Sequence, residues 1–180
     1  GSVAATDLTT IVGQTSATIV ATAATAITGT AAEVVAAINH AQVNHDDNFL
    51  VTLTAASTAA AADLKTINTA TSGIITATGV ATITGSASDV TDVLAVETSQ
   101  GNAGQQIDLD TDFTVTVSDT GNVSALTLTN IDDNTPGNVT VTNTVTLTGT
   151  AAQIRLAAQR DAADTLQLAA DFGATVDAGS

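Results

Sequence analysis

The sequence predicts a mixed α/β fold, arranged as a repeat assembly of solenoid-like type in which short strands alternate with short capped helices. Two observations lead to this prediction. Self-comparison of the 180 residues finds a unit of about 60 residues in nearly three copies, and each copy changes from strand-like alternation to helical spacing. Stacked units bury apolar surface that one unit cannot bury alone. Tandem small α+β repeat domains are the alternative.

The repeat is visible at two ungapped offsets. At an offset of 56, residues 27–31 match residues 83–87, and at an offset of 64 residues 83–87 match residues 147–151. The two offsets differ by an eight-residue insertion near residues 96–102, whose polar composition and glycine predict a loop.

These matches divide the chain into segments. Residues 1–2 (Gly-Ser) are expected to be a cloning remnant. Residues 3–45 are then a partial first repeat, residues 46–109 the second, and residues 110–180 a third repeat from a truncated array.

Strands are predicted from two patterns within each unit. Thr alternates with Val or Leu across residues 140–148, as it does in half-buried strands. Apolar side chains also recur at a spacing of eight, which is even and can place them on one face of extended segments as a ladder in the core. The ladder positions are Ile11, Ile19, Ile27, then Ile67, Ile75, Ile83, then Ile131, Val139, Leu147.

Helices are predicted where each unit passes an Ile/Leu-Thr-Gly step. A Ser or Thr hydroxyl there can accept a hydrogen bond from the N–H three residues on, and the side chain at that position can reach back. The pairs are Thr30 with Glu33, Ser86 with Asp89, and Thr150 with Gln153. A second Ala-rich helix is predicted at about residues 58–67. Its counterpart at residues 123–131 has Thr-rich alternation and stays open between a helix, a strand and an irregular turn.

Several of these segments resemble repeats from very large secreted or surface proteins of bacteria, marine cyanobacteria among them. The resemblance is carried by residues 51–54, 64–68, 71–73 and 27–34 with its two later copies, and it covers most of residues 7–172. It implies a segment of a long extracellular array from an adhesin, an S-layer or a motility-associated protein, often containing calcium.

The composition excludes several classes of function. Eighteen acidic and three basic side chains give a net charge of −15, which repels nucleic-acid phosphates and anionic lipid headgroups. A membrane-spanning helix needs about 18 consecutive apolar residues, and the sequence has no uninterrupted apolar stretch of that length. Cys, Trp and Tyr are absent, so thiol chemistry is excluded and stacking platforms for glycans are poor. We therefore expect no nucleic-acid partner and no membrane insertion.

The sequence contains no recognisable catalytic motif. His40 and His45 are the only imidazoles, they have no counterparts in the other copies, and a polar loop explains them. Neither a Gly-x-Ser-x-Gly elbow nor a phosphate-binding loop is present. We predict no catalytic or cofactor-binding residues and expect that the chain is not an enzyme.

Clustered aspartates are the candidate metal ligands. Carboxylates at alternate positions suit calcium, although Phe113 stands where a helix-loop-helix calcium loop needs glycine, so a site of another geometry is predicted. The alternative is that these acids keep strand ends soluble and block pairing of sheet edges. The candidate calcium ligands are Asp108, Asp110, Asp112, Asp46, Asp47, Asp132 and Asp133.

The predicted function is a non-catalytic structural or adhesive repeat segment of a large extracellular bacterial surface protein, with calcium as a candidate stiffening ion. The alternative is a binding module that holds a protein or glycan partner in a groove between repeats or at the Asp-rich loops. The expected partners are the neighbouring repeats of the parent protein and a cell-surface or protein partner, and the expected location is extracellular or at the cell surface.

Overall fold

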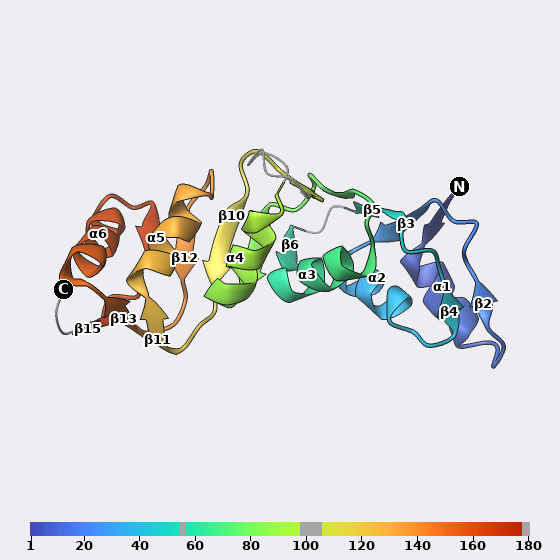
Figure 1. Ribbon diagram of the computed structural model, residues 1–180, viewed down its shortest axis with the longest axis horizontal. Coiled ribbons are helices and arrows are strands. Elements are labelled where there is room, and N and C mark those ends of the chain that lie inside the picture. Colours follow the sequence, from blue (N-terminus) through green and yellow to red (C-terminus); the bar gives the residue numbers. More distant parts are fainter. Residues whose placement is uncertain (55–56, 98–105, 178–180) are drawn as a thin grey trace.

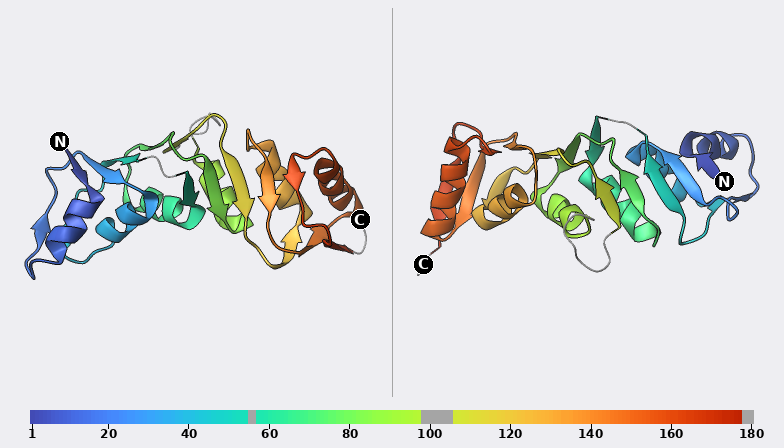
Figure 2. Two further views of the ribbon diagram at one scale, coloured as in Figure 1. Left: turned by 180° about the vertical axis from the view of Figure 1, so that it is seen from behind. Right: turned by 90° about the horizontal axis from the view of Figure 1, so that it is seen from above.

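The protein is a mixed α/β structure, as the sequence predicts. The computed structural model describes residues 1–54, 57–97 and 106–177, and within these it contains six α-helices together with parallel sheets. Most of the predicted insertion at residues 96–102 lies outside the described residues. The molecule is elongated, and its termini lie at opposite ends (Figures 1 and 2).

The elements alternate along the chain. In order they are β1 (Ser2–Ala4), α1 (Ala5–Val12), β2 (Ile19–Val20), β3 (Ala26–Gly29), α2 (Ala31–Ile38), β4 (Val43–Asn44), β5 (Leu50–Leu53), β6 (Thr58–Ala60), α3 (Ala61–Ala70), β7 (Ile75–Ala77), β8 (Thr82–Gly85), α4 (Ala87–Ala95), β9 (Ile107–Leu109), β10 (Thr114–Val117), β11 (Gly121–Ser124), α5 (Ala125–Asp133), β12 (Val139–Val141), β13 (Val145–Gly149), α6 (Ala151–Ala162), β14 (Leu166–Gln167) and β15 (Gly173–Val176).

The strands form four parallel sheets. Two have five strands, in the orders β1-β3-β5-β7-β9 and β6-β8-β10-β12-β14, one has the order β11-β13-β15, and β2 pairs with β4. Ser2 pairs with Ala26, and Ala26 pairs with Leu50, so neighbouring strands here are 24 residues apart in sequence. Consecutive helices contact one another and follow the long axis from α1 to α6 (Figure 1).

The predicted helix starts are confirmed. Thr30 and Thr150 each form a capping box with the side chain three residues on, and the Ser86 hydroxyl accepts from the N–H of Asp89. Each cap satisfies a backbone donor that the first turn of a helix leaves unpaired. The caps therefore set the starts of α2, α4 and α6.

The open segment at residues 123–131 is a helix for most of its length. Ser124 caps α5 by accepting a hydrogen bond from the N–H of Thr127. Leu128 and Ile131 are buried on one face, and the hydroxyl of buried Thr129 donates to the carbonyl of Leu126. Because this threonine is satisfied within the helix, its strand propensity does not decide the conformation.

The predicted ladder of eight-residue spacing is wrong as a set of extended segments. Ile67 and Ile131 lie in α3 and α5, whereas the positions that follow them lie in strands. The spacing marks one helix and two short strands, each with its apolar side chain in the core. Ile11 is an exception, because its side chain is 45% exposed.

One apolar core runs through the described residues from α1 to β14. It joins helix residues such as Leu64 with strand residues such as Ile83 and with Phe49 and Phe113, which lie just before β5 and β10. Threonines pair on the other side of the strands, as in the 2.9 Å hydrogen bond between the hydroxyls of Thr82 and Thr114. Pairs of this kind stabilise neighbouring strands.

The longest described helix, α6, has 12 residues. None of the described helices is long and apolar enough to cross a membrane.

Candidate functional site

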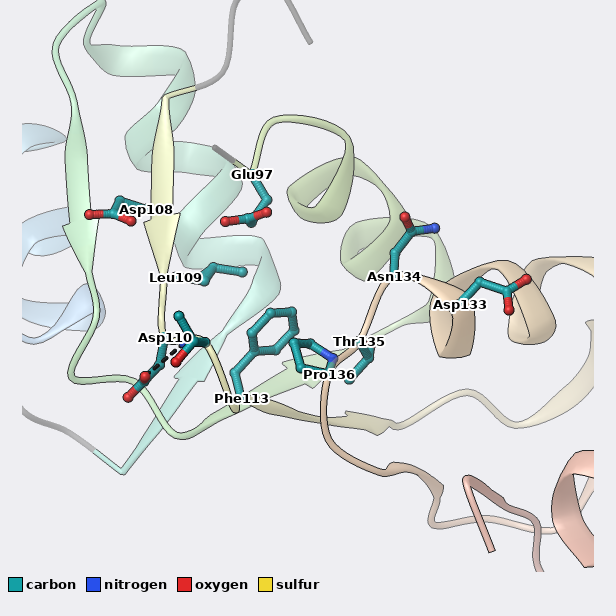
Figure 3. A pocket seen from close by; sticks show the side chains of 10 residues that line it. Glu97, Asp108, Leu109, Asp110, Phe113, Asp133, Asn134, Thr135 and Pro136 are labelled. Atoms are coloured by element: carbon teal, nitrogen blue, oxygen red, sulfur yellow. Dashed lines mark hydrogen bonds between the residues drawn. The ribbon is translucent and has the colours of Figure 1, made fainter. Parts of the chain in front are cut away.

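A hollow with four acidic side chains in its lining lies beside β9, between the turn that leads into β10 and the end of α5 (Figure 3). It has a volume of about 340 Å³. Its lining is Glu97, Asp108, Leu109, Asp110, Thr111, Phe113, Asp133, Asn134, Thr135 and Pro136. Three of the predicted calcium ligands are therefore brought to one hollow.

The carboxylates of this hollow do not converge on one point. Those of Asp108 and Asp133 lie on opposite sides and point away from each other (Figure 3). Asp110 accepts a 2.7 Å hydrogen bond from the N–H of Thr111, and Glu97 is only 4% exposed. In the described part of the chain, no group of three or more His, Asp or Glu residues is placed to hold a metal ion. The calcium site stays a prediction.

Asp132 and Asp133 bind a cation of the chain itself. The Arg160 guanidinium, on α6, donates from Nη1 to Asp132 Oδ2 and from Nη2 to Asp133 Oδ1, both at 2.7 Å, and Nη1 also donates to the Thr129 carbonyl at 2.9 Å. Partial burial lowers the pKa of Arg160, but hydrogen bonds to the two carboxylates outweigh burial and raise that pKa above its ordinary value. We call this group the Arg160 clamp. It joins α5 to α6.

A second clamp joins α3 to α4. The Lys65 ammonium is 3.0 Å from Asp89 Oδ1 and 2.6 Å from Asp92 Oδ2. The hydrogen bonds that Lys65 donates to Asp92 and to Asp89 raise the pKa of Lys65. Those that Asp89 accepts from Lys65 and Ser86 lower the pKa of Asp89. Lys65 and Arg160 are two of only three basic side chains in the chain. Both join neighbouring helices.

The remaining predicted ligands lie elsewhere. Asp46 and Asp47 are exposed in the turn before β5, where their carbonyls contact the His45 ring and the N–H of Ser72. The His45 ring also packs edge-on against Phe49, with centroids 4.9 Å apart. Asp112 is exposed in the turn before β10. These contacts hold the His45 ring in the turn.

Sequence reasoning missed the clamps. In the sequence Arg160 stands beside Asp161 and close to Asp164, whereas its ion-pair partners come from the preceding helix. The signal lay in the scarcity of cations: each of three basic side chains in a strongly acidic chain can pair with any carboxylate that the fold brings near it.

No family model, no curated protein and no solved structure matches the chain. Its function is therefore argued from geometry.

Proposed function

We propose that this chain is a non-catalytic structural segment of a large bacterial surface protein, built as a solenoid-like stack of repeat units. The proposed unit has two helices and five strands, in the order β-α-β-β-α-β-β. Three units run from β1 to β5, from β6 to β10 and from β11 to β15. Their boundaries fall at residues 54–57 and 118–120, somewhat later than residues 46 and 110.

The unit length agrees with the sequence repeat. Helices α1, α3 and α5 begin at residues 5, 61 and 125, which reproduces the offsets of 56 and 64. Helices α2, α4 and α6 begin at residues 31, 87 and 151, with the same two offsets. Positions separated by these offsets, and strands with the same place in the unit, are called equivalent below.

The observation that carries the proposal is the sharing of sheets between units. Strands β1, β3 and β5 of the first unit continue into β7 and β9 of the second, and β6, β8 and β10 continue into β12 and β14 of the third. A unit needs its neighbour to complete a sheet, as stacked repeats do. Separate tandem α+β domains would keep each sheet within one unit.

A mechanical role suits this arrangement. Neighbouring units are joined by backbone hydrogen bonds across the shared sheets, and helices within a unit are joined by the two clamps. The acidic surface, with its net charge of −15, keeps such a stack soluble and separates it from other acidic surfaces. Calcium bound by the exposed aspartates would reduce this charge.

Labelling of cells tests the surface location. An antibody raised against the 180-residue chain should label intact cells of the organism that makes the protein, and permeabilisation should add little signal. An antibody against a cytoplasmic protein of the same cells is the control and should label only after permeabilisation. Labelling that appears only after permeabilisation would refute the proposal.

The acidic hollow favours a second function, as a binding module. Phe113 and Pro136 supply an apolar floor, while Asp108 and Asp110 supply charge, so a basic peptide segment of a partner protein fits the chemistry. Titration calorimetry with a lysine- and leucine-containing peptide tests this function. Binding that is lost in Asp110→Asn supports it, and the absence of heat at millimolar peptide excludes it for this hollow.

A further inference from the structure

The two ends of the molecule carry the two parts of an incomplete sheet. Inside the chain, each five-stranded sheet has three strands from one unit and two from the next. At the C-terminal end the third unit has only its three strands, β11-β13-β15, and at the N-terminal end the first unit has only its two, β2-β4. Under the repeat arrangement proposed above, on which this inference rests, β15 is equivalent to β5 and β10, and β2 is equivalent to β7 and β12.

We propose that β15 of one copy pairs in parallel with β2 of a second copy, which completes a five-stranded sheet in the order β11-β13-β15-β2-β4. Strands β2 and β15 lie at opposite ends of the molecule, and within the described residues each pairs with one strand and leaves its other edge open (Figure 1). The contact uses a different surface on each copy, and each added copy presents a new edge. Head-to-tail contacts of this kind form open chains unless a rotation closes them.

The internal junctions give the register of the pairing. Val51 of β5 pairs with Ile75 of β7, and its N–H donates to the Ile74 carbonyl at 3.0 Å. The second junction repeats this geometry, because Val115 pairs with Val139 and its N–H donates to the Asn138 carbonyl at 3.1 Å.

The same register carries over to the ends. Ala174 occupies the place of Val115, since β13 pairs with β15 as β8 pairs with β10. Ala174 should therefore pair with Ile19 of the second copy and donate its N–H to the Thr18 carbonyl. The N–H of Asp177 donates to Gly149 of β13 at 3.0 Å, so the alternation along the strand points the N–H of Ala174 away from β13.

Burial at the ends differs from burial at the internal junctions in the manner this pairing predicts. Ile11 of α1 is 45% exposed, whereas the equivalent Ile67 and Ile131 are 0% and 1% exposed. At the other end, Val176 of β15 is 54% exposed, whereas Val117 of β10, which pairs with Gly85 as Val176 pairs with Gly149, is fully buried. Both ends therefore present apolar side chains at positions that a neighbouring unit covers elsewhere.

The helices at the two ends of the molecule, α1 and α6, carry side chains of opposite charge. At the junction of the second and third units, α4 packs on α5, and Thr91 and Thr127 line the same surface hollow. The equivalent positions at the ends of the molecule are Arg155 of α6 and Asp7 of α1, both exposed. A second copy packed on the first would therefore place an arginine opposite an aspartate. This opposite charge favours a second copy over other acidic partners.

Sedimentation equilibrium of the 180-residue chain at physiological salt tests the proposal. We expect the weight-average mass to rise from that of the 17.7 kDa monomer at micromolar concentration to about twofold or more near millimolar, as an open head-to-tail contact requires. A constant monomer mass over this range would overturn the proposal.

Three variants locate the contact. Ala174→Pro removes the outward N–H and leaves the hydrogen bonds of β15 to β13, and edge strands tolerate proline in this orientation. It should abolish the rise in mass while circular dichroism stays unchanged. Arg155→Glu and Asp7→Arg should each weaken association by about fivefold to tenfold through the loss of one ion pair and the gain of like-charge repulsion. The double variant restores an ion pair of opposite polarity and should restore association.

Asp63→Arg is the matched control. It changes charge equally at the position equivalent to Asp7, but inside the molecule, where the junction is already formed. Asp7→Arg reduces net repulsion between copies, so weaker association in this variant cannot come from overall charge. Association that survives both Ala174→Pro and the charge reversals would place the contact on another surface and refute the proposal. Cell labelling and sedimentation are independent, so a protein found inside cells with an intact end contact would refute the surface location alone.

Discussion

Arg160→Met tests how strongly the Arg160 clamp holds α5 to α6. Methionine keeps the apolar stem and removes the three hydrogen bonds of the guanidinium. The Asp133 side chain is 59% exposed, so loss of its ion pair with Arg160 should cost little stability, because exposed ion pairs are worth at most about 1 kcal/mol. Asp132 is only 8% exposed, and the Thr165 hydroxyl, which donates to it at 3.3 Å, would be its remaining side-chain partner among the described residues.

The expected loss follows from these exposures. A hydrogen bond to a buried charge is worth about 1.5–3 kcal/mol, and the remaining exposure of Arg160 reduces this, so we expect a loss of about 2 kcal/mol in the free energy of unfolding. For a protein of this size, the midpoint of thermal unfolding should fall by roughly 4–8 °C.

Urea unfolding followed by far-ultraviolet circular dichroism measures the loss, since the chain lacks Trp and Tyr as fluorescent probes. Arg155→Met is the matched control on the same helix, because Arg155 donates only to Gln159 at 3.4 Å and is exposed. Adding Asp132→Asn to Arg160→Met should recover part of the loss, as the uncompensated charge disappears. Equal stability of Arg160→Met and Arg155→Met would refute the reasoning.

Four further predictions concern packing, repeats and ions. Gly73→Ala should destabilise the fold by several kcal/mol or prevent folding, because a Cβ would overlap the Phe49 carbonyl oxygen. Gly13→Ala is the control and should change stability by less than about 1 kcal/mol, because a Cβ there meets its neighbours at ordinary contact distance. Thermal unfolding measures both. A fragment of residues 1–54 should be unfolded by circular dichroism while residues 1–120 fold, since one unit cannot complete a sheet; a cooperatively folded shorter fragment would contradict this. Binding of calcium with a Kd of about 0.1 mM would add about 2.7 kcal/mol at 10 mM, so equal unfolding midpoints in calcium and magnesium would refute the aspartate prediction. Because the pKa of Asp89 is lowered by folding, its carboxylate contributes to the free energy of unfolding above its unfolded pKa of 3.8, and this contribution is lost as pH falls through the lower folded pKa. Asp89→Asn should therefore be less stable at neutral pH and should lose less stability over that pH window, as acid unfolding by circular dichroism would show.

The helix starts could be predicted from sequence because a cap is a local interaction. Thr30, Ser86 and Thr150 bond within three residues, so no distant contact is needed to form them. Residues 125–133 also have a local cap, at Ser124, but their Thr-rich alternation left the conformation open, and it is the burial of Leu128 and Ile131 that agrees with a helix. Local patterns therefore predicted the helices that begin at a cap after a Thr-Gly step better than the helix whose Thr-rich sequence left its conformation open.

The site was less predictable than the fold. Acidic clusters in the sequence indicated metal ligands, but the fold turns Asp108 and Asp133 away from each other and places Asp132 beside Arg160. That partner lies 28 residues further along the chain, at a distance that no local pattern specifies. Parallel strand pairing creates such contacts, because it aligns residues of successive helices.

The difference between the sequence repeat and the strand spacing has a structural cause. Strands pair at a spacing of 24 residues along much of the chain, yet the sequence resembles itself only at offsets of 56 and 64. Successive helices start in two different ways. Helices α2, α4 and α6 follow a Thr-Gly step with a capping Thr or Ser, whereas α1, α3 and α5 follow a strand directly, without a Thr-Gly step. Side-chain identities therefore repeat only when both kinds of helix have passed, and the shared sheets require the same two-helix period. A junction between copies must obey that period too, which is why β15 finds its complement in β2 and not in β1.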